Sequence, residues 1–302
     1  MLSLLMLASA VGMKNYPIKL RNVISKMKDS TQSALKNRVS RMEVELPPAV
    51  DFGIEKGGIF DNLPEIEKIK RSNREAARLF TEMFSMLGST TCVLFTTEAE
   101  ARAAKSSFKG FSGQCISIDS AGKSAKGFSN LRSRRFTAEE QEAALLGSDG
   151  IYVPDETEVL IIPGPRAKDF KKIKKLHEKF GEGTLIILLN SRVDAVEILA
   201  GDGDDGGLNW VREGFHPVFS YCPPVIINQQ GAAESRDDLL LYHEYQDKWY
   251  VACNKNGGDK GSMLGNIAMG MAGAQPFTTL MTSEKRMSPR ELSDALNGSI
   301  MG

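Results

Sequence analysis

The chain has 302 residues, of which 41% are hydrophobic and 25% are charged, as is usual for a globular protein. Its 38 basic and 38 acidic residues cancel, which excludes attraction of nucleic acid by overall charge, so no nucleic-acid partner is predicted. The four cysteines form no CxxC motif and pair with none of the three histidines at zinc-ligand spacing. We therefore predict free thiols, a reducing compartment, no metal and no cofactor.

The first fifteen residues resemble part of a targeting segment. The stretch "MLSLLMLASA" is apolar but too short to span a bilayer, and its small residues resemble a cleavage site. Residues 1–41 contain eight Lys or Arg and a single acidic residue, which is typical of a plastid transit segment. We expect 1–15 to be a leader or its remnant. No later apolar run is long enough to predict a transmembrane span.

Residues 17–39 carry apolar side chains at helical spacing, and the polar side of this predicted helix is mostly basic. Lys19, Lys26, Lys28 and Lys36 are candidate partner-binding residues, because a basic amphipathic helix can contact an acidic protein or the surface of an anionic membrane. A solvated face on a packed helix explains the same pattern and is the preferred interpretation.

The segment "RMEVELPP" alternates apolar residues with Glu43 and Glu45, as expected of a half-buried strand. Side chains two residues apart on a strand share a face, so a two-carboxylate site is one interpretation. Solvated carboxylates, or carboxylates beside a basic neighbour, are the preferred one. No catalytic residue is assigned, and replacing both glutamates by glutamine is expected to leave folding nearly intact.

The next segments alternate between helices and strands. Helices are predicted over 72–87, 98–108 and 167–183. Continuous apolar runs near 90–97, 158–163 and 184–190, with a shorter strand near 114–120, indicate buried strands. This order predicts an α/β fold with a mostly parallel sheet and helices on both faces, a Rossmann-like three-layer arrangement. Aromatic and β-branched runs over 216–227 and 239–254 predict antiparallel strands in the C-terminal third.

The predicted organisation is a single α/β domain over 16–253 and a Gly/Met-rich tail over 254–302 that ends in a short helix.

Two motifs match ligand loops only in part. Gly122-Lys123-Ser124 lacks the first glycine of a P-loop. The acidic stretch near 202–213 lacks one oxygen ligand of a calcium loop. We interpret both as solvated loops.

The carboxyl ends of parallel strands are where α/β proteins bind ligands. Arg166 and Arg192 follow two of the predicted strands, and Asn190 ends the second, so these three residues are candidate ligand- or anion-binding residues. Ordinary loop arginines are the simpler interpretation. If a ligand binds there, the chain would be a nucleotide- or phosphometabolite-binding enzyme.

The order of the segments resembles a domain-of-unknown-function family of plastids and cyanobacteria that includes the low photosystem II accumulation proteins. The resemblance spans about residues 16–253. The motifs that carry it are "RMEVELPP", "NREAARLFTEMF", "CVLFTTEAEARAA", "VLIIPGP", "LIILLN", "FHPVFSYCPP" and "LYHEYQDKWYV". The resemblance implies an α/β domain and residence in the plastid, in the stroma or on the stromal face of thylakoids. It also implies a non-enzymatic role in photosystem II assembly or stability through binding of photosystem or thylakoid proteins, and it brings no catalytic residues.

Overall fold

A computed structural model describes residues 14–17, 19–55, 60–119, 153–195, 207–228, 230–254 and 277–300. The contacts divide the chain into two compact units. The parallel unit is residues 34–217, and the antiparallel unit is residues 1–33 with 218–302. Helix α1 (Leu20–Lys36) begins in the antiparallel unit and ends in the parallel unit. Within the described segments, no helix is both long and apolar enough to cross a membrane.

The parallel unit contains five parallel strands in the spatial order β1, β5, β4, β2, β3. Their bounds are β1 Arg41–Glu45, β2 Thr91–Phe95, β3 Gln114–Ser117, β4 Val159–Pro163 and β5 Leu185–Leu189. Every residue of β2 and β4 is buried. This is why their sequences are continuous apolar runs: a parallel strand between two helix layers has no solvated face.

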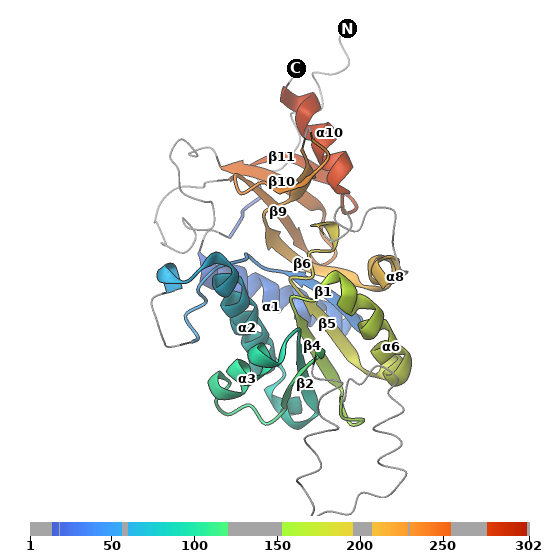
Figure 1. The fold of residues 1–302 in the computed structure, drawn as a ribbon. Helices are drawn as coiled ribbons and strands as arrows, with labels where there is room; N and C mark the ends of the chain where they lie inside the picture. The colour runs from blue at the N-terminus through green and yellow to red at the C-terminus, as the bar shows by residue number, and fades with distance from the viewer. Residues whose placement is uncertain are drawn as a thin grey trace, which may run out of the picture. The chain divides into compact units, whose positions relative to one another are not determined.

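Helices cover both faces of these strands (Figure 1). One face carries α2 (Glu65–Met83) and α3 (Glu98–Ser107), and the other carries α6 (Phe170–Phe180) and α8 (Gly207–Gly214). On the α6 side, Phe170, Ile173 and Leu176 pack onto Leu160 and Leu188 in one apolar cluster. The 3.6-residue spacing of those three residues explains why α6 buries one side and exposes its lysines. Helix α2 begins at Glu65, immediately after Pro64, and therefore seven residues before the predicted start.

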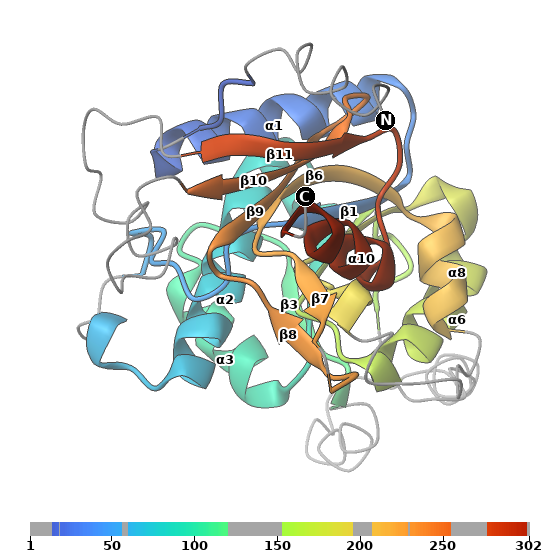
Figure 2. The same ribbon diagram turned by 90° about the horizontal axis from the view of Figure 1, so that it is seen from above.

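The antiparallel unit contains β6 (His216–Cys222), β9 (Leu239–Glu244), β10 (Trp249–Asn254) and β11 (Phe277–Ser283), each paired antiparallel with the next. A small pair, β7 (Val225–Ile227) and β8 (Ala233–Ser235), and helix α10 (Pro289–Ile300) complete it (Figure 2). Leu292 and Leu296 of α10 pack with Ile226 and Trp249 in its apolar cluster.

The predicted α/β class, with a mostly parallel sheet and antiparallel strands in the C-terminal third, is confirmed. The predicted division into a leader, one domain and a tail stays a prediction. The region predicted as a tail contains the expected terminal helix, α10, and also β11, which the sequence did not indicate. The Gly122-Lys123-Ser124 motif lies outside the described residues. Of the acidic stretch 202–213, residues 207–213 are described, and they lie in α8.

Candidate functional site

The chain leaves β2 and β4 in opposite directions, which makes their carboxyl ends the topological switch point of the parallel strands. Strand β2 pairs with both β3 and β4, and β4 pairs with β5. Helix α3 leads from β2 to β3 on one face, whereas α6 leads from β4 to β5 on the other. In open α/β sheets a crevice forms at such a point and ligands bind there. These strand ends therefore define the candidate site.

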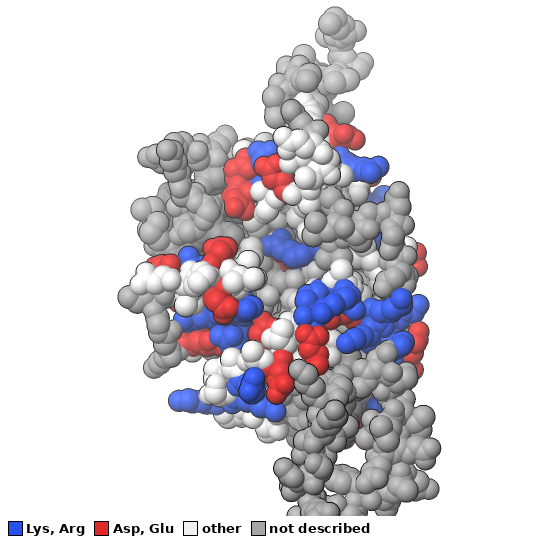
Figure 3. Space-filling view, viewed as in Figure 1, with Lys and Arg blue, Asp and Glu red and all other residues white. Residues whose placement is uncertain are grey.

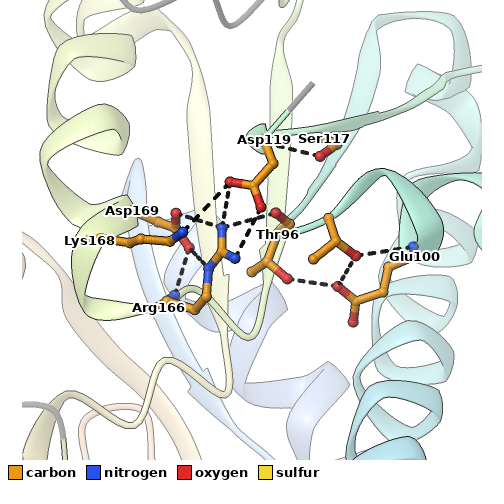
Figure 4. Close-up of polar contacts among 8 residues, drawn as sticks. Thr96, Glu100, Ser117, Asp119, Arg166, Lys168 and Asp169 are labelled. Carbon is orange, nitrogen blue, oxygen red and sulfur yellow. Dashed lines mark hydrogen bonds and ion pairs between the residues drawn. The ribbon is translucent and has the colours of Figure 1, made fainter. Parts of the chain in front are cut away.

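Arg166 lies at this point and joins three strand ends (Figure 4). Its guanidinium donates to both carboxylate oxygens of Asp119, at 3.1 and 2.9 Å, and to the Thr96 carbonyl at 3.0 Å. It also donates to both oxygens of Asp169, at 2.8 and 3.0 Å. Thr96 follows β2, Asp119 follows β3 and Arg166 follows β4. The guanidinium is thus already engaged by two carboxylates of its own chain.

The two carboxylates differ in burial. The side chain of Asp169 is fully buried, and it also accepts the backbone N–H of Arg166 at 2.9 Å. The side chain of Asp119 is 38% exposed, and Lys168 lies 4.0 Å from it. Hydrogen bonds from Arg166 lower the pKa of Asp119, and the hydrogen bond to Asp169 raises the pKa of Arg166. Asp119 and Arg166 are therefore both charged at neutral pH. Asp119 and Lys168 lie on the solvent side of the cluster.

The amino end of α3 lies beside this cluster and is capped by side chains of the same segment. Thr97 is the N-cap and accepts the backbone N–H of Glu100. The Glu100 carboxylate accepts hydrogen bonds from the hydroxyls of Thr96 and Thr97, at 2.7 and 3.0 Å. A carboxylate of the chain thus already occupies the end of α3 that attracts anions.

The turn after β5 holds the other two candidate residues. The Asn190 side chain accepts the backbone N–H of Leu46 at 2.6 Å and donates to Asn73 of α2 at 2.8 Å. Asn190 and Arg192 have φ angles of 52° and 50°, a region that non-glycine residues seldom adopt. Asn190 is 6% exposed. Its polar groups therefore hold the turn against β1 and α2.

Glu43 and Glu45 are buried, which corrects the expectation that they face water, whereas the alternative of a basic neighbour is met for Glu45 by Arg192. Their exposed fractions are 5% and 1%. The Ser191 hydroxyl lies 2.6 Å from Glu43 and 3.1 Å from Glu45, and the Arg192 N–H donates to Glu45 at 2.8 Å. The Arg192 guanidinium lies 3.5 Å from the same carboxylate. The apolar face of β1 is also buried, so alternation along the strand did not mark a solvated side.

The candidate anion-binding residues therefore belong to two clusters. Arg166 contacts the ends of β2 and β3, whereas Asn190 and Arg192 contact β1 and α2. Among the described residues, no group of three or more His, Cys, Asp or Glu is placed to hold a metal ion. Sequence reasoning missed Asp119 and Asp169 as partners of Arg166. The position of Asp119 after a predicted strand was the available signal.

The candidate partner-binding lysines lie on the exposed side of α1 and, for Lys19, immediately before its first residue. Lys19 and Lys36 are exposed and Lys28 is partly exposed. Lys26 donates to Glu244 at 3.1 Å. Within the part of the chain that the structure describes, Lys19, Lys28 and Lys36 have no acidic partner. They are thus available to an external one.

Helix α6 presents a second basic surface. Figure 3 shows Lys and Arg side chains gathered over its position in Figure 1. The helix has five lysines and a single acidic residue: Lys171, Lys172, Lys174, Lys175 and Lys179, with Glu178. Lys179 pairs with Asp155 at 2.7 Å. Lysines four residues apart on a helix repel each other and so destabilise the helix. Helix stability therefore does not account for the presence of these lysines.

An apolar groove of about 390 Å³ lies at the opposite edge of the parallel strands, near the amino ends of β4 and β5. Its lining includes Leu35, Val39, Phe84, Val159 and Leu185. Ligands of parallel α/β proteins bind at the carboxyl ends of the strands. The groove is therefore separate from the candidate site at the switch point.

These features define an α/β protein whose strand-end charges are paired internally and whose helices α1 and α6 carry exposed lysines. The chain belongs to the family described as "Domain of unknown function (DUF1995)", whose family model matches residues 17–292. No curated protein and no solved structure matches the chain.

Proposed function

We propose that this chain is a non-enzymatic plastid protein that assists the assembly or stability of photosystem II by binding other proteins at the stromal face of thylakoids. Two arguments support the proposal. The segments quoted above resemble a domain-of-unknown-function family that includes the low photosystem II accumulation proteins. The chain also distributes its charges as a binding protein would, because Lys19, Lys28 and Lys36, which no described acidic residue contacts, lie at the start and on the outer side of α1.

The distribution of paired and unpaired cations is the observation that carries the proposal. Arg166 is held by Asp119 and Asp169, and Arg192 lies against Glu45. An anionic ligand at the strand ends would have to displace these carboxylates. Lys19, Lys28 and Lys36 need no such displacement, because no described acidic residue contacts them. Binding of an acidic protein surface to α1 therefore costs less free energy than binding of a small anion at the strand ends, where an existing ion pair has to be broken first.

A nucleotide- or phosphometabolite-binding enzyme is the second candidate, and the switch point is the observation that favours it. Asp119 and Lys168 lie on the solvent side of the Arg166 cluster. A phosphate could take the place of Asp119 on the guanidinium, since both bind arginine through two parallel hydrogen bonds. Thermal-shift measurements with nucleotides and sugar phosphates test this function. A shift that Asp119→Asn enlarges would support it, and no shift with any compound would count against it.

The binding role is tested by affinity purification from isolated thylakoids with two matched variants. The test variant replaces Lys19, Lys28 and Lys36 with glutamine. The control variant replaces Lys68, Lys105 and Lys109, which removes the same charge from other parts of the surface. We expect the wild-type chain and the control to retain photosystem II proteins and the α1 variant to lose them. Equal retention by both variants would exclude α1 as the contact, and recovery of no photosystem protein by the wild-type chain would overturn the proposal.

A further inference from the structure

A lysine ammonium group lies in a cage of acidic and aromatic side chains in the antiparallel unit. The ammonium of Lys14 donates a hydrogen bond to Asp247 and lies 3.2 Å from a Glu244 oxygen. It also lies 5.4 Å from the ring centre of Tyr242 and 5.0 Å from that of Tyr250. The Lys14 side chain is only 20% exposed.

The cage is held in shape by contacts that do not involve Lys14. The Tyr242 hydroxyl donates to Glu244 at 2.7 Å, and the Tyr250 hydroxyl donates to Asp247 at 3.0 Å. Lys26 of α1 donates to the other oxygen of Glu244. Tyr242 and Tyr250 come from the paired strands β9 and β10, where they lie directly opposite each other. The hairpin therefore preorganises the site, which reduces the entropy cost of binding.

This set of groups is suited to an alkylammonium ion. Two carboxylates accept charge-assisted hydrogen bonds from an ammonium group, and tyrosine rings attract a cation to their faces. Burial alone would lower the pKa of Lys14, but hydrogen bonds to Asp247 and Glu244 outweigh it and raise the pKa. Against the opposing effect of burial, hydrogen bonds from Tyr242, Lys26 and Lys14 lower the pKa of Glu244. The hydrogen bond from Lys14 likewise lowers the pKa of Asp247 against burial. All three groups are therefore charged at neutral pH.

Lys14 can leave without disturbing the segment that follows it. The Tyr16 hydroxyl lies 2.6 Å from the Thr279 hydroxyl, and the Tyr16 ring packs edge-on against Tyr242. The Tyr221 hydroxyl donates to the carbonyl of Pro17 at 2.8 Å. Both anchors lie after Lys14 in the chain. Removal of the leader predicted over 1–15 would take Lys14 away and leave these anchors and the cage in place.

We propose that Tyr242, Glu244, Asp247 and Tyr250 form a binding site for a lysine side chain, which Lys14 fills within the chain and a lysine of a partner protein fills when Lys14 is absent. The inference deepens the proposed binding role by naming the chemistry of one contact. It concerns a cation of the partner, whereas α1 offers cations to an acidic surface. The two contacts can therefore be tested separately.

The test uses the full chain with Lys14→Ala and two blocked amino acids, Nα-acetyl-lysine methylamide and its norleucine analogue, which lacks the ammonium. At roughly tenfold excess over its Kd, the lysine compound is expected to raise the Tm of the variant by about 2–5 °C. The norleucine compound should leave the Tm unchanged, and the wild-type chain should respond to neither. Adding Glu244→Gln and Asp247→Asn to the variant should abolish the response.

If Lys14→Ala does not fold, Lys14→Gln gives the same test, because glutamine keeps part of the stem without the positive charge. Equal shifts with both compounds, an undiminished shift after the cage carboxylates are neutralised, or no shift with the lysine compound would each overturn the proposal. The measurement uses purified protein and no plastid component. Its failure is therefore distinguishable from failure of the photosystem interaction.

Discussion

Arg166 permits a direct test of how burial sets the strength of an ion pair, because two carboxylates hold the same guanidinium. Asp169 has no exposed surface and accepts three hydrogen bonds, including the backbone N–H of Arg166. Asp119 accepts two and is 38% exposed. Asp169→Ala leaves the partly buried N–H of Arg166 without its acceptor and removes one carboxylate from the guanidinium. We expect a loss of about 2–3 kcal/mol in the free energy of unfolding. Asp119→Ala removes a solvent-screened pair and should cost less than about 1 kcal/mol.

Urea titration of both variants, followed by circular dichroism and by tryptophan fluorescence, measures the two losses. Two probes are needed because the chain has two compact units, and unfolding is treated as two-state only where the probes coincide. Arg166→Lys serves as a further variant that keeps the positive charge but not the geometry of the guanidinium. Equal losses for Asp169→Ala and Asp119→Ala would refute the argument from burial.

Three further outcomes follow from single residues. Arg38 is exposed and has a φ of 59° just after α1 ends. Glycine adopts this left-handed conformation without steric cost, so Arg38→Gly should raise the free energy of unfolding by about 0.5–1 kcal/mol in urea titration. A loss of stability would contradict this. The folded-state pKa of Asp119 is lowered by Arg166, so the stability it contributes is present above its unfolded-state pKa and is lost as the pH falls through the folded-state value. Acid titrations should therefore show a smaller acid-induced loss for Asp119→Asn than for the wild type, and identical losses would exclude the coupling. Burial raises the pKa of the Cys115 thiol to about 12 and also raises that of Cys92, so a thiol reagent at pH 8 should label neither residue until the chain is unfolded; rapid labelling of the folded chain would show the packing to be wrong.

The sequence predicted the parallel strands well because burial on both faces leaves a local signature. Strands β2, β4 and β5 are runs of four or five nearly unbroken apolar residues, the pattern typical of strands that are buried on both faces. Strand β11 has no such signature. Its residues alternate between buried and exposed positions less regularly, and its place depends on pairing with β10. Pairing between distant segments is not encoded in local spacing, so the strand could not be predicted.

The same limit explains the error at Glu43 and Glu45. Alternation along β1 correctly placed Met42 and Val44 in the core, but it could not show what covers the opposite face. The turn after β5 decides that, and it lies about 150 residues away in the sequence. The Lys14 cage was missed for a similar reason: its cation and its carboxylates come from opposite ends of the chain.

The turn over residues 190–192 donates hydrogen bonds to the carboxylates of Glu43 and Glu45 in β1. The same hydrogen bonds hold the turn in its conformation. Left-handed φ angles at Asn190 and Arg192 are unfavourable for these residues, and the contacts of Asn190 with Leu46 and of Arg192 with Glu45 hold the turn in place. Ser191 lies between Glu43 and Glu45, but its hydroxyl has a single proton and donates to one carboxylate at a time. Replacing both glutamates by glutamine would leave one acceptor oxygen on each side chain and place an amide donor where the second oxygen accepts the contacts that fix the turn. The double substitution is expected to destabilise the chain, contrary to what alternation along the strand implied.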